Sequence, residues 1–350
     1  FLFRCDRPEL VRRNWEHTRF EWKHSDAIKE LTTVPRLRDA YVSARNAARS
    51  GGLPGADDIL RQVEKDAQHG AEELGLWTLD ALLADLKSIQ SRCEDHAEVV
   101  SEFRKTCTEA LAVRPSMAPP VSAAAEAFSA VQDAESPADG QHALTEILNR
   151  REAAPLEAAR RAAEHVKSDA GVVTLSYSST VLATLHQAAD RLDRLIVGES
   201  RPANEGRRTA KLAVSFGIPV TLATDAGATS LTQQADLLLL GADALQEDGS
   251  AVNKTGSTAL AAAAGLFDCP CLIVTTESKV LPTGRETELE EKPPEELGES
   301  IRGVDVSNVY FERVPPRLID TIAGENGTLS PERIRELAGW RKNLCDLLRQ

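Results

Sequence analysis

The chain contains 350 residues, of which 42% are hydrophobic, and its formal net charge at pH 7 is −13. This length is sufficient to bury a sizeable core and predicts two domains. A chain this acidic argues against a dedicated nucleic-acid-binding surface, so we expect no direct nucleic-acid partner. No apolar run approaches the roughly 18 residues of a membrane helix, and no signal peptide is evident. We therefore expect a cytoplasmic protein without a membrane partner.

Six cysteines are scattered along the chain without the paired spacing of a zinc site or a small disulfide framework. We predict free, buried thiols in a reducing compartment. The histidines also lack metal-site spacing, so we expect no metal ligand and no cofactor.

The first 40 residues differ in character from the rest of the chain. The stretch WEHTRFEW at residues 15–22, followed by TVP at residues 33–35, resembles the closing segment of a Nudix hydrolase domain. The Glu-rich box that binds magnesium in that family appears nowhere in the sequence. Residues 1–40 are therefore expected to be a remnant or tail of a preceding Nudix-like domain, with no catalytic role. Because the chain begins at Phe1 rather than Met, we expect it to be part of a longer protein.

Residues 41–152 have the pattern of a helical domain. Apolar residues recur every three or four positions from Ile59 to Leu86, which gives the helices one buried face. Gly70 lies within this pattern, where a glycine costs helix stability, so we expect a neighbouring segment to approach closely there. Arg114 precedes a proline that interrupts the helical pattern.

Residues 153–350 predict an α/β domain, because short apolar runs alternate with helical stretches. This alternation is typical of a Rossmann-like parallel sheet with helices on both faces. In such sheets ligands bind beyond the carboxyl ends of the strands, so the segments after each strand are the ones that matter. The expected strands are residues 172–175, 195–197, 220–223, 237–240 and 272–275.

One of these segments carries a carboxylate and a lysine. The apolar run Leu237–Leu240 ends at a glycine, which places Asp243 just beyond the strand. Asn253 and Lys254 then lead into an Ala-rich helix, and a helix N-terminus attracts small anions through its free N–H groups. An ordinary strand–loop–helix joint, in which these polar residues only cap the helix or Asp243 pairs with Lys254, explains the pattern equally well.

Other strand ends add cations and hydroxyls. Arg201 precedes a predicted helix and is able to hold a phosphate through two parallel N–H bonds. Ser176 and Ser178 belong to a row of hydroxyls after the first strand, and Lys279 follows the last one. We therefore predict a phosphate-binding pocket at this edge.

Five long motifs follow one another in a fixed order: ESRP…EGRR from residue 199, ATDAGA from 223, GADALQEDGSAVNKTGS from 241, VTTESK from 274 and NVYFERVPPRLIDTIAGENG from 308. They resemble the superfamily that comprises the alpha, beta and delta subunits of translation initiation factor 2B and two isomerases, of ribose 1,5-bisphosphate and of methylthioribose 1-phosphate. The resemblance covers about residues 55–330, and the stretch QHGAE at residues 68–72 departs from the methylthioribose branch. Within the superfamily, the resemblance is nearest to the ribose 1,5-bisphosphate isomerase type.

The resemblance implies an aldose–ketose isomerase site built on an aspartate and a cysteine. The aspartate position falls on Asp243, whereas the cysteine position falls on Ser176. A hydroxyl is a far poorer proton acceptor than a thiol, so three alternatives stay open. They are an active isomerase that uses Ser176 or Tyr177, a binding protein without turnover, and an interaction protein related to the translation-factor subunits.

The resemblance also implies a ligand and an assembly. The expected partner is a phosphorylated sugar or nucleotide, and the expected assembly is a homodimer or higher homo-oligomer formed through the sheet domain. The residues expected to bind the substrate are Gly70, Arg114, Ser178, Arg201, Asn253, Lys254 and Lys279.

Overall fold

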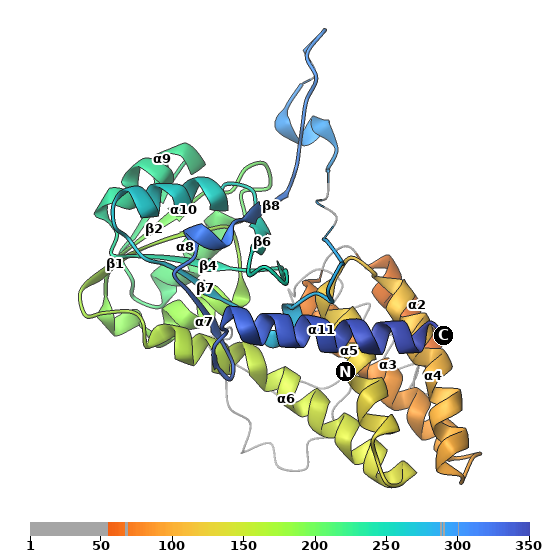
Figure 1. Ribbon diagram of the computed structural model, residues 1–350. Helices are drawn as coiled ribbons and strands as arrows, with labels where there is room; N and C mark the ends of the chain where they lie inside the picture. Colours follow the sequence, from red (N-terminus) through yellow and green to blue (C-terminus); the bar gives the residue numbers. More distant parts are fainter. Residues whose placement is uncertain (1–54, 67–68, 288, 290, 300) are drawn as a thin grey trace, which may run out of the picture.

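The computed structural model describes residues 55–66, 69–287, 289, 291–299 and 301–350. The Nudix-like segment predicted for residues 1–40 lies outside the described residues. Within the described part, the chain forms a helical region, then a mostly parallel sheet with helices on both faces (Figure 1). The predicted fold class is therefore confirmed.

The helical region shares one aliphatic core. Leu79, Leu82 and Leu86, which belong to the predicted apolar stripe, are fully buried and share one core cluster with Phe103. Asp95 caps the helix that follows it by accepting a hydrogen bond from the backbone N–H of Glu98, as an N-cap carboxylate does. The helices are α2 (Ala56–Lys65), α3 (Ala71–Gln90), α4 (His96–Val113), α5 (Ala118–Gln132) and α6 (Pro137–Ala163).

The main sheet has the strand order β10-β9-β7-β4-β1-β2-β3. All neighbours pair in parallel except β10, which is antiparallel to β9. The five predicted strands are all present, and each begins and ends within three residues of the expected positions. The strands are β1 (Ala170–Leu175), β2 (Leu192–Gly198), β3 (Val220–Ala223), β4 (Leu237–Gly241), β7 (Cys271–Val274), β9 (Thr321–Gly324) and β10 (Gly327–Thr328).

Successive side chains of a strand point to opposite faces of the sheet, where they pack in two separate hydrophobic cores. Val172 and Leu239 pack with α6, α7 (Ser179–Gln187) and α8 (Gly206–Ser215) on one face. Val173 and Leu240 pack with α9 (Asp225–Leu231), α10 (Ser257–Leu266) and α11 (Pro331–Leu348) on the other. Strands buried on both faces read as continuous apolar runs, which is why the sequence revealed them.

The strand order reverses direction between β1 and β4. From β1 the chain adds β2 and β3 on one side, and it then returns to place β4 on the other side of β1. Such a topological switch point opens a crevice at the carboxyl ends of the two strands. Leu175 pairs with Gly198 and Gly241 pairs with Val274, so the carboxyl ends of β1, β2, β4 and β7 lie at one edge.

A second, antiparallel sheet of order β5-β6-β8 lies beyond β4. It contains β5 (Ala244–Leu245), β6 (Ala251–Lys254) and β8 (Phe311–Val314). Asn253 and Lys254 therefore lie on a strand, whereas the sequence analysis placed them in a loop. Their strand partners, Glu312 and Phe311, are distant in sequence, so no local pattern indicated this pairing.

The C-terminal helix α11 connects the two regions (Figure 1). Ile334 and Leu337 pack on the sheet, while Cys345 and Leu348 join the core of the helical region. Within α11, the buried Arg341 forms an ion pair with Glu126 of α5, with an N–O distance of 2.8 Å. The domain boundary expected at residues 152 and 153 falls inside the continuous helix α6.

Candidate functional site

Ser176 and Asp243 lie on either side of the switch point. Ser176 directly follows β1, and Asp243 follows β4 by two residues. The pairing of Val172 with Leu237 and of Val173 with Leu238 sets the register, so Ser176 and Gly241 lie at the same level of the sheet. The two positions that the family resemblance singled out therefore flank the crevice where doubly wound sheets bind ligands.

The backbone of Ser176 has a fixed, unusual conformation. Its φ of 67° lies in the left-handed region, which a non-glycine residue adopts at a cost. Its carbonyl oxygen accepts a hydrogen bond of 2.6 Å from the hydroxyl of Thr209, a buried residue in the first turn of α8. The strained turn is thus fixed to the neighbouring helix.

The segment that carries Asp243 is fixed from both sides. The backbone N–H of Asp243 donates to the carbonyl of Val252 on β6, at 2.8 Å. Lys279, after β7, donates from Nζ to the carbonyl of Ala242, at 2.5 Å. Lys279 therefore lies beside the residue that precedes Asp243, at the edge where the sequence analysis placed it.

Lys254 is buried and already has a carboxylate partner. Its side chain is 5% exposed, and Nζ lies 2.9 Å from Oε1 of Glu205, the residue that precedes α8. The ammonium also lies 3.7 Å from the ring centroid of Tyr310, a cation–π contact. Sequence analysis did not single out Glu205 or Tyr310, although both lie within the motifs that carry the family resemblance.

The side chains of Asn253 and Ser178 stabilise the N-terminal ends of α10 and α7. The Asn253 amide donates to the hydroxyl of Ser257 at 2.9 Å, at the beginning of α10. The hydroxyl of Ser178 accepts from the backbone N–H of Val181 and so caps α7. A Cβ placed on Gly241 would lie 2.8 Å from Ser178 Oγ, so Ser178 also packs against the end of β4.

Two arginines follow the carboxyl end of β2: Arg201 in the loop and Arg208 in the first turn of α8. Arg201 is exposed, and its backbone N–H, like that of Ser200, donates to the carboxylate of Asp225. Arg208, which the sequence analysis did not single out, stacks on the ring of Tyr177 with its Cζ 3.8 Å from the ring centroid. Both are able to meet an anion without losing an ion pair within the described residues.

Gly70 and Arg114 lie in the helical region. Gly70 is the residue before α3 rather than part of a helix, and a Cβ there would meet no atom within 4 Å. The expectation of a close approach at Gly70 was therefore wrong. Arg114 donates to the backbone carbonyls of Val63 and Asp66 and so closes the end of α2.

The N-terminus of α3 nevertheless reaches the sheet edge. The carboxylate of Glu72, in the first turn of α3, accepts hydrogen bonds from the hydroxyls of Thr276 and Ser278. The backbone N–H of Glu277 donates to the carboxylate of Glu325. Burial, with smaller contributions from Glu277 and Glu72, raises the pKa of Glu325 to about 7.

The cysteines within the described residues are all buried and free. Burial raises the pKa of Cys269 to about 11 and that of Cys271 to about 12. Cys271 begins β7, at the opposite end of the strand from the site. Neither thiol is able to replace the missing family cysteine.

Among the described residues, no group of three or more His, Cys, Asp or Glu side chains is arranged to hold a metal ion. No described helix is long and apolar enough to cross a membrane.

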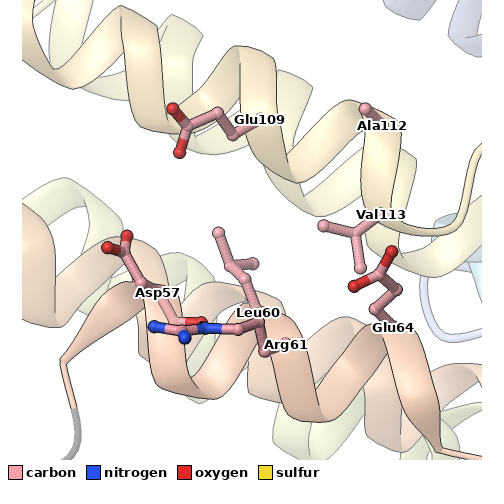
Figure 2. Close-up of a pocket in the computed structure, with 7 residues that line it drawn as sticks. All are labelled: Asp57, Leu60, Arg61, Glu64, Glu109, Ala112 and Val113. Carbon is pink, nitrogen blue, oxygen red and sulfur yellow. The ribbon is translucent and has the colours of Figure 1, made fainter.

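Two hollows lie away from Ser176 and Asp243. One, of about 320 Å³, lies between α2 and α4, and its walls carry the carboxylates of Asp57, Glu64 and Glu109 (Figure 2). Arg61, which also lines it, is paired with Asp58. The second, of about 350 Å³, is lined by residues that include Glu277 and Arg333, and these two form an ion pair. An acidic hollow repels phosphate, so the first hollow does not suit the predicted ligand.

Strand order, register and the polar residues at the carboxyl edge define a doubly wound α/β protein with a candidate ligand site at its switch point. A model of the initiation factor 2 subunit family matches residues 67–331, and the chain belongs to that family.

Among curated relatives, the ribose 1,5-bisphosphate isomerase of Haloferax volcanii is 32% identical over 208 residues, which cover 55% of this chain and 64% of the relative. The methylthioribose-1-phosphate isomerase of Nostoc punctiforme is 33% identical over 183 residues, 48% of this chain and 52% of the relative. Both matches span less than two thirds of the relatives' own length. The solved structure of translation initiation factor eIF-2B from Pyrococcus horikoshii OT3 is 27% identical, with a TM-score of 0.60, and the match covers 79% of this chain and 97% of that one.

Proposed function

We propose that this chain binds a phosphorylated sugar at the β1–β4 switch point and acts there as an aldose–ketose isomerase of a ribose 1-phosphate derivative. The observation that carries the proposal is the placement of Ser176 and Asp243 on either side of that crevice. The similarity to two sugar-phosphate isomerases supports the same substrate class.

The chemistry sets the roles of the two residues. A phosphate on the anomeric oxygen prevents the sugar ring from opening unaided, so one group must protonate the ring oxygen. A second group must move a proton from C2 to C1. In the proposal Asp243 approaches the ring oxygen, and Ser176 stands where the isomerases of this family carry a thiol. Arg201, Arg208 and Lys279 supply the positive charge that a phosphate requires.

Ser176 also supports a second candidate function. Without a thiol, the site would bind the sugar phosphate as a sensor, and the chain would act as a non-catalytic regulatory or interaction protein. The similarity to eIF-2B of Pyrococcus horikoshii favours this alternative. Turnover separates the two functions, since only the isomerase converts its ligand.

We further propose a cytoplasmic homodimer or higher homo-oligomer formed through the sheet domain. The edge strand β3 supports this assembly, because Leu222 on it is 40% exposed and Val214 at the end of α8 is 60% exposed. Exposed strand edges with apolar side chains are surfaces that pair with other chains. Light scattering after size exclusion tests this, and a monomer mass at micromolar concentration would contradict it.

Calorimetric titration with ribose 1,5-bisphosphate and ribose 1-phosphate tests the proposed function. We expect saturable binding of at least one ligand, weakened about tenfold or more by Arg201→Gln because a guanidinium–phosphate contact is lost. Arg194→Gln is the matched control, since Arg194 is exposed on β2 far from its carboxyl end. Absence of binding of both ligands would contradict the proposal.

A further inference from the structure

One buried side chain holds both sides of the turn η5 (Glu277–Lys279), which follows β7. Arg341 of α11 is 1% exposed, and its Nη1 donates to the carbonyl of Glu277 at 2.7 Å and to the carbonyl of Val280 at 2.6 Å. These two carbonyls precede and follow Lys279 in the sequence. A single nitrogen of the guanidinium group therefore fixes the backbone on either side of the lysine.

Arg341 is itself oriented by a carboxylate of the helical region. Its Nη2 donates to Oε1 of Glu126 on α5 at 2.8 Å, and Arg151 of α6 pairs with the same oxygen at 2.9 Å. Burial raises the pKa of Glu126, but the neighbouring Arg151 and Arg341 outweigh this effect and lower that pKa to about 2. The carboxylate is therefore ionised at neutral pH and keeps both guanidinium groups in place.

The cluster of Arg151, Glu126 and Arg341 carries a net positive charge, because two guanidinium groups share a single carboxylate. A buried charge is costly unless hydrogen bonds compensate it. Arg151 donates to the carbonyl of Pro119 within the helical region, whereas the carbonyl partners of Arg341 flank the turn after β7. The segment that carries Lys279 thus compensates part of the charge that the helical region buries.

Two further contacts connect the same turn to the helical region. The hydroxyl of Ser122 on α5 donates to the carbonyl of Ser278, at 2.9 Å. The carboxylate of Glu72 on α3 accepts hydrogen bonds from the hydroxyl of Ser278. The position of Lys279 is therefore set by side chains of α3, α5 and α11 as well as by the strand that precedes it.

We infer that Arg341 is a positioning residue for the ligand site: through the two carbonyls that flank Lys279, it fixes the lysine where its ammonium reaches the carbonyl of Ala242. Its effect on binding passes through Lys279, without contact with the ligand. The alternative is an ion pair that only joins α11 to α5. A buried ion pair adds little net stability over well-packed apolar side chains of similar volume, so stability alone does not account for a charge here. The inference rests on the proposed function, in which Lys279 supplies charge for a phosphate.

A double-mutant cycle tests the inference. We expect Arg341→Met to weaken the binding of ribose 1-phosphate about fivefold, because the two carbonyls lose their donor and the lysine is no longer fixed. In a Lys279→Met background, the same substitution should change the affinity by less than about twofold. Glu126 keeps Arg151 as its partner, so no buried carboxylate is left unpaired. An unchanged affinity of Arg341→Met, or equal losses in both backgrounds, would overturn the inference.

Arg333→Met is the matched control. Arg333 also belongs to α11 and also contacts Glu277, but it pairs with the side-chain carboxylate, at an N–O distance of 3.1 Å, and not with a carbonyl beside Lys279. We expect this variant to bind ribose 1-phosphate as the unmodified protein does. A loss as large as that of Arg341→Met would contradict the inference, since any change in the contacts of α11 would then be sufficient.

A second variant covers the case in which Arg341→Met does not fold. Arg341→Lys keeps a cation beside Glu126 but lacks the planar guanidinium group that reaches several acceptors at once. We expect a loss of affinity of about threefold, which again disappears in the Lys279→Met background. A loss that persists in that background would refute the role assigned to Arg341.

Hydrogen exchange gives a readout that needs no ligand. The backbone N–H of Val280 donates to the carbonyl of Glu277 across the turn. We expect Arg341→Met to accelerate exchange of the Lys279 and Val280 amides at least about tenfold, with no change for the amides of β1. Equal acceleration in the turn and in β1 would indicate a global loss of stability and would overturn the inference. Absence of ligand binding to the unmodified protein would contradict the proposed function instead, and the exchange rates would still decide whether Arg341 fixes Lys279.

Discussion

The ammonium of Lys279 donates a hydrogen bond of 2.5 Å to the carbonyl of Ala242, and this contact joins the segment after β7 to the segment that carries Asp243. The turn that carries Lys279 is held by the buried Arg341 of α11, which donates to the carbonyls of Glu277 and Val280. One lysine thus both supplies charge to the edge and fixes the position of the proposed acid.

Replacing Lys279 tests this double role. We expect Lys279→Met to lower the affinity for ribose 1-phosphate about tenfold, because a cation is lost and Ala242 loses its bonded donor. Lys211→Met, at an exposed position of α8, is the control and should bind as the unmodified protein does. Calorimetry measures both. Equal affinity of Lys279→Met and the unmodified protein would remove Lys279 from the site.

Restoring a thiol at the position after β1 should increase turnover. A cysteine thiol has a pKa of about 8.5 and exchanges protons near neutral pH far more readily than a hydroxyl. We expect Ser176→Cys to raise the rate of ketose formation about tenfold or more, within the usual range of general acid–base catalysis. Ser215→Cys, on the exposed end of α8, controls for thiol chemistry elsewhere. A rate no higher than that of the control would argue that Ser176 does not occupy the catalytic position.

The sheet was predictable from sequence because its central strands β1, β4 and β7 are short, mainly apolar runs buried on both faces. The helical region was predictable for the same kind of reason, since its buried stripe repeats every three or four residues. Gly70 was misplaced because the stripe runs on across the break between α2 and α3, so the pattern did not show that the glycine lies between two helices. The spacing of apolar residues indicates which face of a helix is buried, but it does not indicate where the helix ends.

The pairing of Lys254 with Glu205 was not predictable, because the two residues lie 49 positions apart in the sequence and neither belongs to a local motif that indicates its partner. The strand position of Lys254 depends on β8, which lies more than 50 residues further along the chain. Contacts between distant segments decide which charges are already neutralised. Sequence therefore indicated which strand ends carry polar groups, and the structure was needed to show how those groups are combined.

Two helical glycines should respond to alanine in opposite directions. A Cβ on Gly206, at the first position of α8, would lie 1.9 Å from the carbonyl oxygen of Gly198, so Gly206→Ala must displace the helix from β2. We expect a loss of at least about 2 kcal/mol in the free energy of unfolding. Gly265 in α10 has no atom within 4 Å of a Cβ, and Gly265→Ala should gain about 0.5 kcal/mol. Urea denaturation measures both, and a stable Gly206→Ala variant would refute the close contact.

Glu325 should make stability depend on pH. Burial raises its pKa from 4.5 to about 7, so between these values the folded protein retains a proton that the unfolded chain releases. The stability that this group contributes is therefore complete below pH 4.5 and is lost as the pH rises to 7. We expect Glu325→Gln to be more stable than the unmodified protein at pH 7.5 by about 2 kcal/mol, and to show no such advantage near pH 4.5. Urea denaturation at both pH values checks this. The same difference in the free energy of unfolding between variant and unmodified protein at both pH values would contradict it.

The proposed isomerase is tested most directly by a phosphorus and proton NMR time course with ribose 1,5-bisphosphate and ribose 1-phosphate. The account predicts conversion of at least one of them to its ketose, and Asp243→Asn should abolish the conversion. Line broadening without conversion would support the binding site and the non-catalytic alternative, with Ser176→Cys as the next variant. Spectra of both ligands that do not change in the presence of the protein would contradict the account.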